Sequence, residues 1–170
     1  MPQAVVHVLF AIILLDLFRD YVIKNKKAIP LHYIFIGGVA GLLPDIDIPL
    51  FWLVKHILGF EVPWFHRLFT HSLFMIGLFL VLTLLVKLYC SDKKKWVLFA
   101  VITFGVSLHV LLDGLLAGTI ALYYPFSSLQ VGLDLLGNVA FESFMEGLDA
   151  IVLLVWLWDL DRRHRLRDYI

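Results

Sequence analysis

Histidine and aspartate side chains recur in this sequence at spacings that suit metal binding. His109 and Asp113 are four residues apart, and Asp45 and Asp47 are two apart. Residues four apart share one face of a helix. Imidazole and carboxylate groups suit zinc, manganese or iron, and a catalytic zinc site uses about three protein ligands with one position left for water. The candidate ligands are His7, Asp45, Asp47, His66, His71, His109 and Asp113.

Seven candidate ligands exceed what one catalytic ion needs, which favours two or three ions that share carboxylates. Metal ions about 3.5–4 Å apart are typical of phosphoester cleavage, where one ion activates water and another stabilises the leaving oxygen. Asp45 or Asp47 could serve as ligand or general base. Arg67 is the guanidinium nearest to these motifs and could bind a phosphate oxygen. The single cysteine, Cys90, excludes a disulfide framework and a cysteine-based zinc cluster.

The rest of the composition indicates where such a site would lie. Of the 170 residues, 61% are hydrophobic and 16% are charged, and the mean hydropathy is +0.90. Soluble domains are about 45–50% apolar and about 25% charged. A disordered chain, a coiled coil and a basic nucleic-acid binder are excluded, and the sequence predicts an integral membrane protein.

Five apolar segments approach the roughly 20 residues that a membrane-spanning helix needs. They cover approximately residues 4–18, 30–43, 72–89, 96–122 and 146–158. A sixth segment, 48–60, is interrupted by Lys55 and His56, so we expect a helix that lies at the interface or enters partway. Gly37, Gly38 and Gly41 form a stripe of small residues that lets another helix approach closely. The prediction is a single all-α domain over residues 1–170, a polytopic helical bundle.

The positions of the basic residues orient this bundle. In a five-span arrangement with the amino terminus outside, twelve of the fourteen Lys and Arg residues are cytoplasmic, and only Lys55 and Arg67 lie on the outer side. The carboxy terminus is then cytoplasmic, and all seven candidate ligands gather at the outer leaflet. An ionisable side chain inside a span costs about 2.5–3.5 kcal/mol on insertion scales, so such residues usually have a function.

Each candidate also has a purely structural explanation. His7 and His66 could lie in the headgroup region, and Asp45 and Asp47 beside Pro44 could end a helix, a common role of Asp near turns. His109 and Asp113 could form a hydrogen-bonded pair without a metal. We assign no role at the site to His32, His56 and His164.

The order of the motifs resembles a known family. An early His (His7), L-P-D-I-D (43–47), H-R-x-x-T-H-S (66–72), H-x-x-x-D (109–113) and Y-P-F-S (124–127) together resemble the YdjM-type family of inner-membrane, metal-dependent hydrolases. The resemblance extends from His7 to about Ser127. That family is similar to zinc-dependent phospholipase C and the related single-strand nucleases.

This resemblance implies a trinuclear zinc cluster. It assigns the early His to His7 and the H-x-x-x-D pair to His109 and Asp113, with Asp113 bridging two metals. The remaining ligands come from Asp45 or Asp47 and from His66 or His71, and the resemblance leaves open which of each pair coordinates. Acidic residues at the start of the fifth apolar segment could replace the last ligand set of the soluble enzymes: Glu142, Glu146 and Asp149.

The residues and the resemblance lead to one main functional hypothesis. We expect a metal-dependent phosphoesterase that acts on a lipid or lipid-linked phosphate at the outer face of the inner membrane. The apolar stretches 48–60 and 123–126 could admit an acyl chain. The alternatives are a non-catalytic metal-binding protein or ion transporter, and a haem protein with histidine axial ligands. Nothing in these residues indicates a nucleic-acid or regulatory partner.

Overall fold

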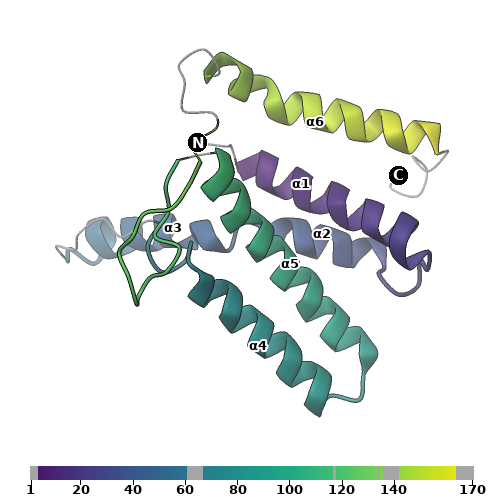
Figure 1. The fold of residues 1–170 in the computed structure, drawn as a ribbon, viewed down its shortest axis with the longest axis horizontal. Coiled ribbons are helices and arrows are strands. Elements are labelled where there is room, and N and C mark those ends of the chain that lie inside the picture. Colours follow the sequence, from purple (N-terminus) through teal and green to yellow (C-terminus); the bar gives the residue numbers. More distant parts are fainter. Residues whose placement is uncertain (1–3, 61–66, 117, 134, 136–141, 164–170) are drawn as a thin grey trace.

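The chain folds into a set of packed helices (Figure 1). The computed structural model describes residues 4–60, 67–116, 118–133, 135 and 142–163. Within these residues every regular element is a helix, and the β-type contact is an isolated antiparallel bridge between Ile120 and Val131. The prediction of an all-α fold is therefore confirmed for the described part of the chain.

The helices follow the apolar segments of the sequence. They are α1 (Ala4–Leu17), η1 (Phe18–Ile23), α2 (Leu31–Ala40), η2 (Pro44–Ile46), α3 (Asp47–Trp52), η3 (Leu53–Ile57), α4 (Leu73–Tyr89), α5 (Lys93–Leu116) and α6 (Glu142–Arg162). Proline marks two boundaries because it has no backbone N–H to donate: Pro30 precedes α2, and Pro44 opens η2. At the start of α5, the Asp92 carboxylate accepts a hydrogen bond from the backbone N–H of Lys94 at 2.9 Å.

The core lies where α1, α2 and α5 meet. Ile12 of α1, Ile34 of α2 and Val101 of α5 are buried in one cluster, which Leu160 of α6 joins. Helix α4 lies along α5, and α6 lies along α1 (Figure 1). Between α4 and α5, the Oγ1 atoms of Thr83 and Thr103 lie 2.8 Å apart and form a buried interhelical hydrogen bond. The bundle therefore combines apolar packing with a polar link between two apolar helices.

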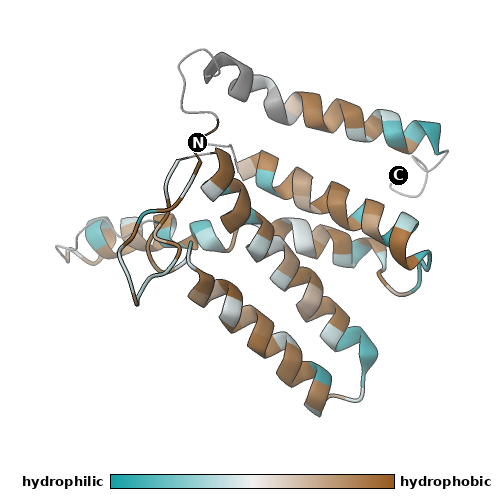
Figure 2. Ribbon diagram, viewed as in Figure 1, coloured by the Kyte–Doolittle hydropathy of each residue, from teal (hydrophilic) through white to brown (hydrophobic). Residues whose placement is uncertain are grey.

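Helix α4 presents an apolar surface to its surroundings. Figure 2 shows hydrophobic residues along most of its length. On this helix Thr83 is buried, whereas Leu80, Leu84 and Leu88 are exposed. A large exposed apolar surface of this kind marks contact with lipid or with another protein rather than with water.

Glycines set the distance between α2 and α5. A Cβ atom built on Gly105 would lie 2.2 Å from the carbonyl oxygen of Gly37 and 3.0 Å from the amide nitrogen of Gly41. These positions therefore require glycine because the two backbones touch. The predicted stripe at Gly37, Gly38 and Gly41 is indeed a helix contact, and Gly105 is its counterpart on α5. This close approach matters for the site described below.

Helices form at all five predicted spans, but their lengths and compositions do not confirm a five-span bundle. In the described part of the chain, α5 is by itself long and apolar enough to cross a membrane. Helix α2 and the segment 44–57 satisfy the same criterion together, with a bend of 47° between them. Helix α1 has 14 residues, which is about 21 Å of helix and less than the roughly 30 Å hydrocarbon core. Whether 44–57 lies at the interface stays a prediction.

An ion-pair network ties α6 to α1 at the end of the molecule where α1 finishes. Arg163 Nη1 lies 2.6 Å from Asp20 Oδ2, and its Nη2 lies 3.1 Å from Asp16 Oδ2. Arg19 Nη2 lies 2.6 Å from the other oxygen of Asp16. Asp16 and Arg19 are buried. Buried charges persist only when they are paired, so this network fixes α6 against α1.

Candidate metal centre

Four segments meet at the opposite end of the bundle and carry the predicted ligands. His7 lies at the start of α1, Asp45 in η2, His71 just before α4, and His109 and Asp113 in the last turns of α5. Figure 1 shows the start of α1 beside the end of α5, with α3 and the start of α4 close by. His7, His71, His109 and Asp113 are buried. The side chains that the sequence separates by up to about a hundred residues are thus brought together at one end of the fold.

His109 is held by a backbone carbonyl. Its Nδ1 lies 2.5 Å from the carbonyl oxygen of Gly41, which can only accept a hydrogen bond. Nδ1 therefore carries the proton, and in the neutral ring Nε2 has a free lone pair. The contact exists because Gly105 lets α5 approach Gly41. This is the arrangement by which proteins orient a metal-binding imidazole.

His71 is held by a chain of two side chains. Its Nδ1 lies 3.0 Å from Thr70 Oγ1, and the Thr70 hydroxyl donates to Asp47 Oδ2 at 2.6 Å. A carboxylate oxygen can only accept a hydrogen bond, so the Thr70 hydroxyl donates one to Asp47 and accepts one from the Nδ1–H of His71. Nε2 of a neutral His71 is then also unprotonated. Asp47 thus acts on His71 through Thr70.

The two unprotonated nitrogens face each other and two carboxylates. His71 Nε2 and His109 Nε2 are 3.1 Å apart. Asp45 Oδ1 lies 3.4 Å from His71 Nε2 and 3.5 Å from His109 Nε2. Asp113 Oδ2 lies 3.3 Å and 3.8 Å from the same two nitrogens. Four lone-pair atoms in a buried space require a cation, either a proton or a metal ion.

The separations fit a tetrahedral metal. Ligand atoms about 2.0–2.1 Å from a tetrahedral zinc ion lie about 3.3 Å from one another. Two groups of three residues have ligand atoms close enough to hold an ion, one with Asp45, His71 and His109, the other with His7, His109 and Asp113. Because the Gly41 carbonyl accepts a hydrogen bond from Nδ1 of His109, this ring has one nitrogen, Nε2, that can bind a metal. His109 therefore cannot be a ligand in both groups at once. The residues present therefore fit a metal, and they fit one ion best at the first group.

Asp113 connects this group to His7 and Arg67. Its Oδ1 lies 3.4 Å from His7 Nε2, and its Oδ2 lies 3.3 Å from Arg67 Nη2. The His7 ring stacks on His109, with centroids 3.9 Å apart and an angle of 24°. Nδ1 of His7 is buried and has no hydrogen-bond partner among the described residues. The two carboxylate oxygens of Asp113 thus face different neighbours.

Arg67 is placed by a turn with an uncommon backbone conformation. Its φ angle is 63°, in the left-handed region that non-glycine residues rarely adopt. Its amide N–H donates to Asp47 Oδ2 at 3.3 Å, which helps to hold the turn. Strain of this kind costs about 1–3 kcal/mol and concentrates at functional sites. The turn carries the Arg67 side chain to Asp113 and leaves it 18% exposed.

Charge in the group favours a cation at His71. Burial alone would lower the pKa of His71, but its hydrogen bonds to Asp113 and Asp45 outweigh burial and raise this pKa above its ordinary value. The same carboxylates that raise the pKa would bind a divalent ion in place of the proton. Asp45 is the carboxylate with partial access to solvent, at 26% exposed, so the group opens beside Asp45 and Arg67.

The comparisons with known proteins place the chain in a family. A family model described as YdjM inner membrane protein matches residues 1–166. The chain belongs to this family. Membership confirms the predicted location in the inner membrane and covers every candidate ligand. The comparisons with curated proteins and with solved structures found no match. The proposed relation of YdjM proteins to zinc-dependent phospholipase C stays a prediction.

Most residues of this group are among the predicted ligands, but the contacts that orient two of them were not predicted. His66 lies outside the described residues, as do the side chains of Glu142, Glu146 and Asp149. His32 and His56 are elsewhere, against Tyr33 and Trp52 respectively.

Two supporting contacts were not predicted. Thr70 was visible as the residue before His71 in the motif, and its position could have indicated a role in orienting the imidazole. The Gly41 carbonyl leaves no signal in a side-chain pattern. Its contact with His109 depends on how α2 and α5 pack.

Proposed function

We propose that this YdjM protein is a metal-dependent hydrolase of phosphoester bonds. The observation that carries the proposal is the closeness of four ligand atoms: His71 Nε2, His109 Nε2, Asp45 Oδ1 and Asp113 Oδ2. The two imidazole nitrogens lie 3.1 Å from each other and 3.3–3.8 Å from the two carboxylate oxygens. Both imidazoles are held so that the nitrogens left unprotonated in the neutral rings face this point. Imidazole and carboxylate donors are the usual ligands of zinc, with manganese and iron as alternatives.

The ligands divide into a main site and a half-site. Asp45, His71 and His109 would hold the first ion, with Oδ2 of Asp113 as its fourth neighbour. His7 Nε2 and Oδ1 of Asp113 would contribute to a second ion, which shares Asp113 with the first. Because Nδ1 of His7 has no hydrogen-bond partner among the described residues, that ring can adopt either tautomer. This arrangement supports two ions, and a third would need residues outside the described part of the chain.

The chain's own groups have distinct tasks in the proposed reaction. A bound divalent ion lowers the pKa of water to about 7 and polarises a phosphoryl oxygen. Asp45, the most exposed carboxylate of the group, would accept a proton from the attacking water. Arg67 would bind a phosphate oxygen and compensate charge that develops on it. Asp47 would position His71 through Thr70 rather than take part directly, because Thr70 and the Arg67 amide already occupy its Oδ2.

A lipid or lipid-linked phosphate is the substrate class that the surroundings favour. Leu50, Trp52, Leu53 and Ile57 follow Asp47 on α3 and η3, and all are exposed apolar side chains. An acyl chain could lie along them while its phosphate reaches Asp45 and Arg67. The location in the inner membrane supports this class. The predicted orientation would place the reaction at the outer face.

The geometry opposes a haem protein. The Nε2 atoms of His71 and His109 are 3.1 Å apart, and His7 stacks directly on His109. No porphyrin plane fits between rings in such contact.

Metal content and hydrolysis together test the proposal. Protein purified in detergent and loaded with Zn²⁺ should retain at least one ion per chain after dialysis, and it should hydrolyse a fluorescent phospholipid. His71→Ala and Asp45→Asn should lose both properties. His32→Ala is the matched control, because His32 contacts Tyr33 and lies outside the group, and it should keep both.

The possible results separate the functions. Metal retention that His71→Ala does not change would contradict the proposed site. Metal bound at the site without hydrolysis of any phosphodiester would leave a metal-binding protein or transporter, and metal-dependent ion flux in liposomes would then identify the transporter. His7→Ala should reduce a two-ion stoichiometry to one ion.

A further inference from the structure

A second feature, distinct from the candidate metal centre, is a large apolar cavity. It has a volume of about 840 Å³ and lies between α1, the segment that joins η1 to α2, and the first turns of α5. Leu15, Phe18, Ile29, Val97, Val101 and Phe104 contribute to its wall. Phe104, the lining residue nearest to His109 along α5, lies five residues before it, about 7.5 Å along the helix, and none of the described candidate ligands lines the cavity. The cavity is therefore separate from the metal centre.

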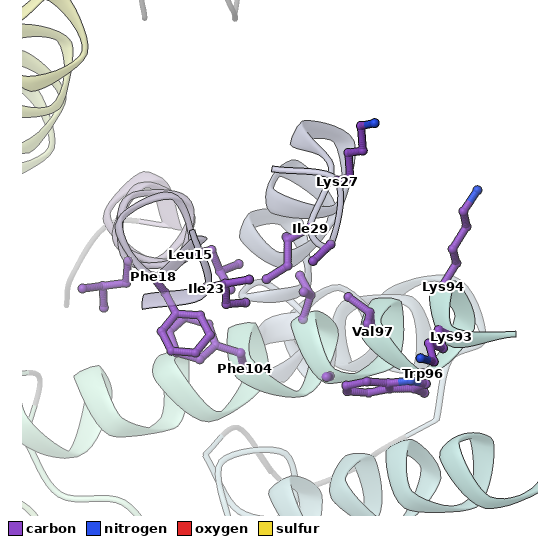
Figure 3. A pocket seen from close by; sticks show the side chains of 14 residues that line it. Leu15, Phe18, Ile23, Lys27, Ile29, Lys93, Lys94, Trp96, Val97 and Phe104 are labelled. Carbon is purple, nitrogen blue, oxygen red and sulfur yellow. The ribbon is translucent and has the colours of Figure 1, made fainter. Parts of the chain in front are cut away.

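Three lysines stand at the edge of this cavity. Lys27 comes from the segment before α2, and Lys93 and Lys94 come from the first turn of α5. Figure 3 shows Lys27 and Lys94 extending away from the apolar wall, with Trp96 beside Lys93. All three lysines are exposed. No acidic residue is among the described residues that line the cavity, so the edge carries a net positive charge.

Trp96 lies between the charged edge and the apolar interior. Its ring lines the cavity, and the ammonium group of a fourth lysine, Lys87 of α4, lies 5.4 Å from its centroid. Tryptophan prefers the boundary between hydrocarbon and headgroups. The order of hydrocarbon wall, tryptophan and lysines therefore matches the order of acyl chain, interface and headgroup in one leaflet.

We propose that this cavity binds one anionic phospholipid from the cytoplasmic leaflet. An acyl chain would fill the space between α1 and α5, and the phosphate would contact Lys27, Lys93 and Lys94. Charge complementarity selects the occupant, since the cationic headgroup of a zwitterionic lipid would add a positive charge beside the three ammonium groups, whereas an anionic lipid brings only the negative charge of its phosphate. Ligand cavities measure about 300–1,000 Å³, so the volume suits part of a lipid. The proposal does not depend on the hydrolase function, and either can fail without the other.

Lipid binding to the purified full-length protein tests this proposal. Native mass spectrometry with added phosphatidylglycerol and phosphatidylcholine of identical chains should show one tightly bound phosphatidylglycerol. Lys94→Glu should weaken this binding by at least about fivefold, because a lysine near an anionic surface contributes about 1 kcal/mol and the new carboxylate also repels the phosphate. Lys95→Glu is the matched control: it makes the same charge change one residue away, and Lys95 does not line the cavity. It should leave the affinity unchanged.

A second variant tests the apolar half of the site. Ala100→Leu adds bulk inside the cavity without changing charge, and it should reduce phosphatidylglycerol binding while thermal unfolding shows that the fold is kept. Equal affinity for the two lipids would overturn the proposal. So would equal effects of Lys94→Glu and Lys95→Glu, which would show that the lysines act only as general surface charge. Occupation of the cavity by a second copy, seen as a dimer that added lipid does not dissociate, would also overturn it.

Discussion

At the scale of single residues, the metal centre depends on which nitrogen of each imidazole carries a proton. The Gly41 carbonyl fixes this for His109, and Thr70 with Asp47 fixes it for His71. The carbonyl is part of the backbone and cannot be removed by substitution. Thr70 can be replaced, which makes it the residue through which this mechanism of orientation is tested.

Thr70→Val should lower metal affinity without removing a ligand. Valine has the shape of threonine but can neither accept the proton of His71 nor donate to Asp47, so the ring loses its preferred tautomer. Loss of such a supporting contact costs about 10–100-fold in affinity. Competition with a chromogenic chelator measures the change. Thr70→Ser keeps the hydroxyl and should restore the affinity, and a failure of serine to do so would contradict the orienting role.

Arg67 combines a strained backbone with a functional side chain, and two substitutions separate these properties. Arg67→Ala and Arg67→Gly both remove the guanidinium, so both should impair hydrolysis, mainly through a higher KM for the phosphate substrate. Glycine adopts a φ of 63° without the Cβ clash, and it should be more stable than the alanine variant by about 1 kcal/mol. Thermal unfolding in detergent compares the two. Equal stabilities would show that the turn is not strained.

At the scale of helices, the approach of α2 to α5 determines the geometry of the centre. Gly105→Ala would place a Cβ atom 2.2 Å from the Gly37 carbonyl oxygen, so the helices must separate. Overpacking of this kind costs about 1–3 kcal/mol. The separation also moves Gly41 away from His109, and metal affinity should fall together with stability.

Gly77→Ala is the matched control for Gly105→Ala. Gly77 lies in the second turn of α4, and a Cβ atom there would meet nothing within 4 Å. This variant should bind metal normally and unfold at or above the wild-type temperature, since alanine favours helix. A loss of metal binding in Gly105→Ala without any change in stability would show that the helix contact does not act through packing.

The sequence predicted these elements better than it predicted their contacts. Hydropathy located the helices, and glycine spacing identified the side of α2 that meets another helix, because both depend on local pattern. The partner Gly105 and the role of Asp16 depend on how distant segments pack. Asp16 has a local partner in Arg19, three residues on, but its second partner, Arg163, is 147 residues away.

The candidate site shows the same limit. The motifs identified the ligand types because metal chemistry restricts them to few residues. They left open whether Asp45 or Asp47 is the metal ligand. The hydrogen bond from Thr70 to Asp47 and the contact of Asp45 with His71 Nε2 favour Asp45. The five-span count is not confirmed and stays a prediction, because apolar composition alone does not measure helix length. The orientation of the bundle stays a prediction.

At the scale of the whole molecule, the net charge of zero is the sum of two opposite ends. In the predicted orientation the cytoplasmic segments carry twelve basic and six acidic residues, and the outer segments carry two basic and eight acidic residues. The totals are +6 and −6. The negative end contains the candidate metal centre, where divalent cations would offset its charge. The positive end contains Lys27, Lys93 and Lys94 at the proposed lipid cavity.

This division predicts which face of the membrane each end occupies, and the single cysteine provides the test. Cys90 lies between α4 and α5, next to Lys93 and Lys94, and is partly exposed. A membrane-impermeant maleimide should label it in inverted inner-membrane vesicles and not in intact spheroplasts, because the positive-inside rule places this connection in the cytoplasm. Ser128→Cys in a Cys90→Ser background reports on the opposite end, since Ser128 is exposed, and it should show the reverse pattern. Labelling of Cys90 in intact spheroplasts would invert the orientation and move both the metal centre and the lipid cavity to the other leaflet. Labelling of both positions from one side would show that α5, which lies between them, does not connect two faces of the membrane.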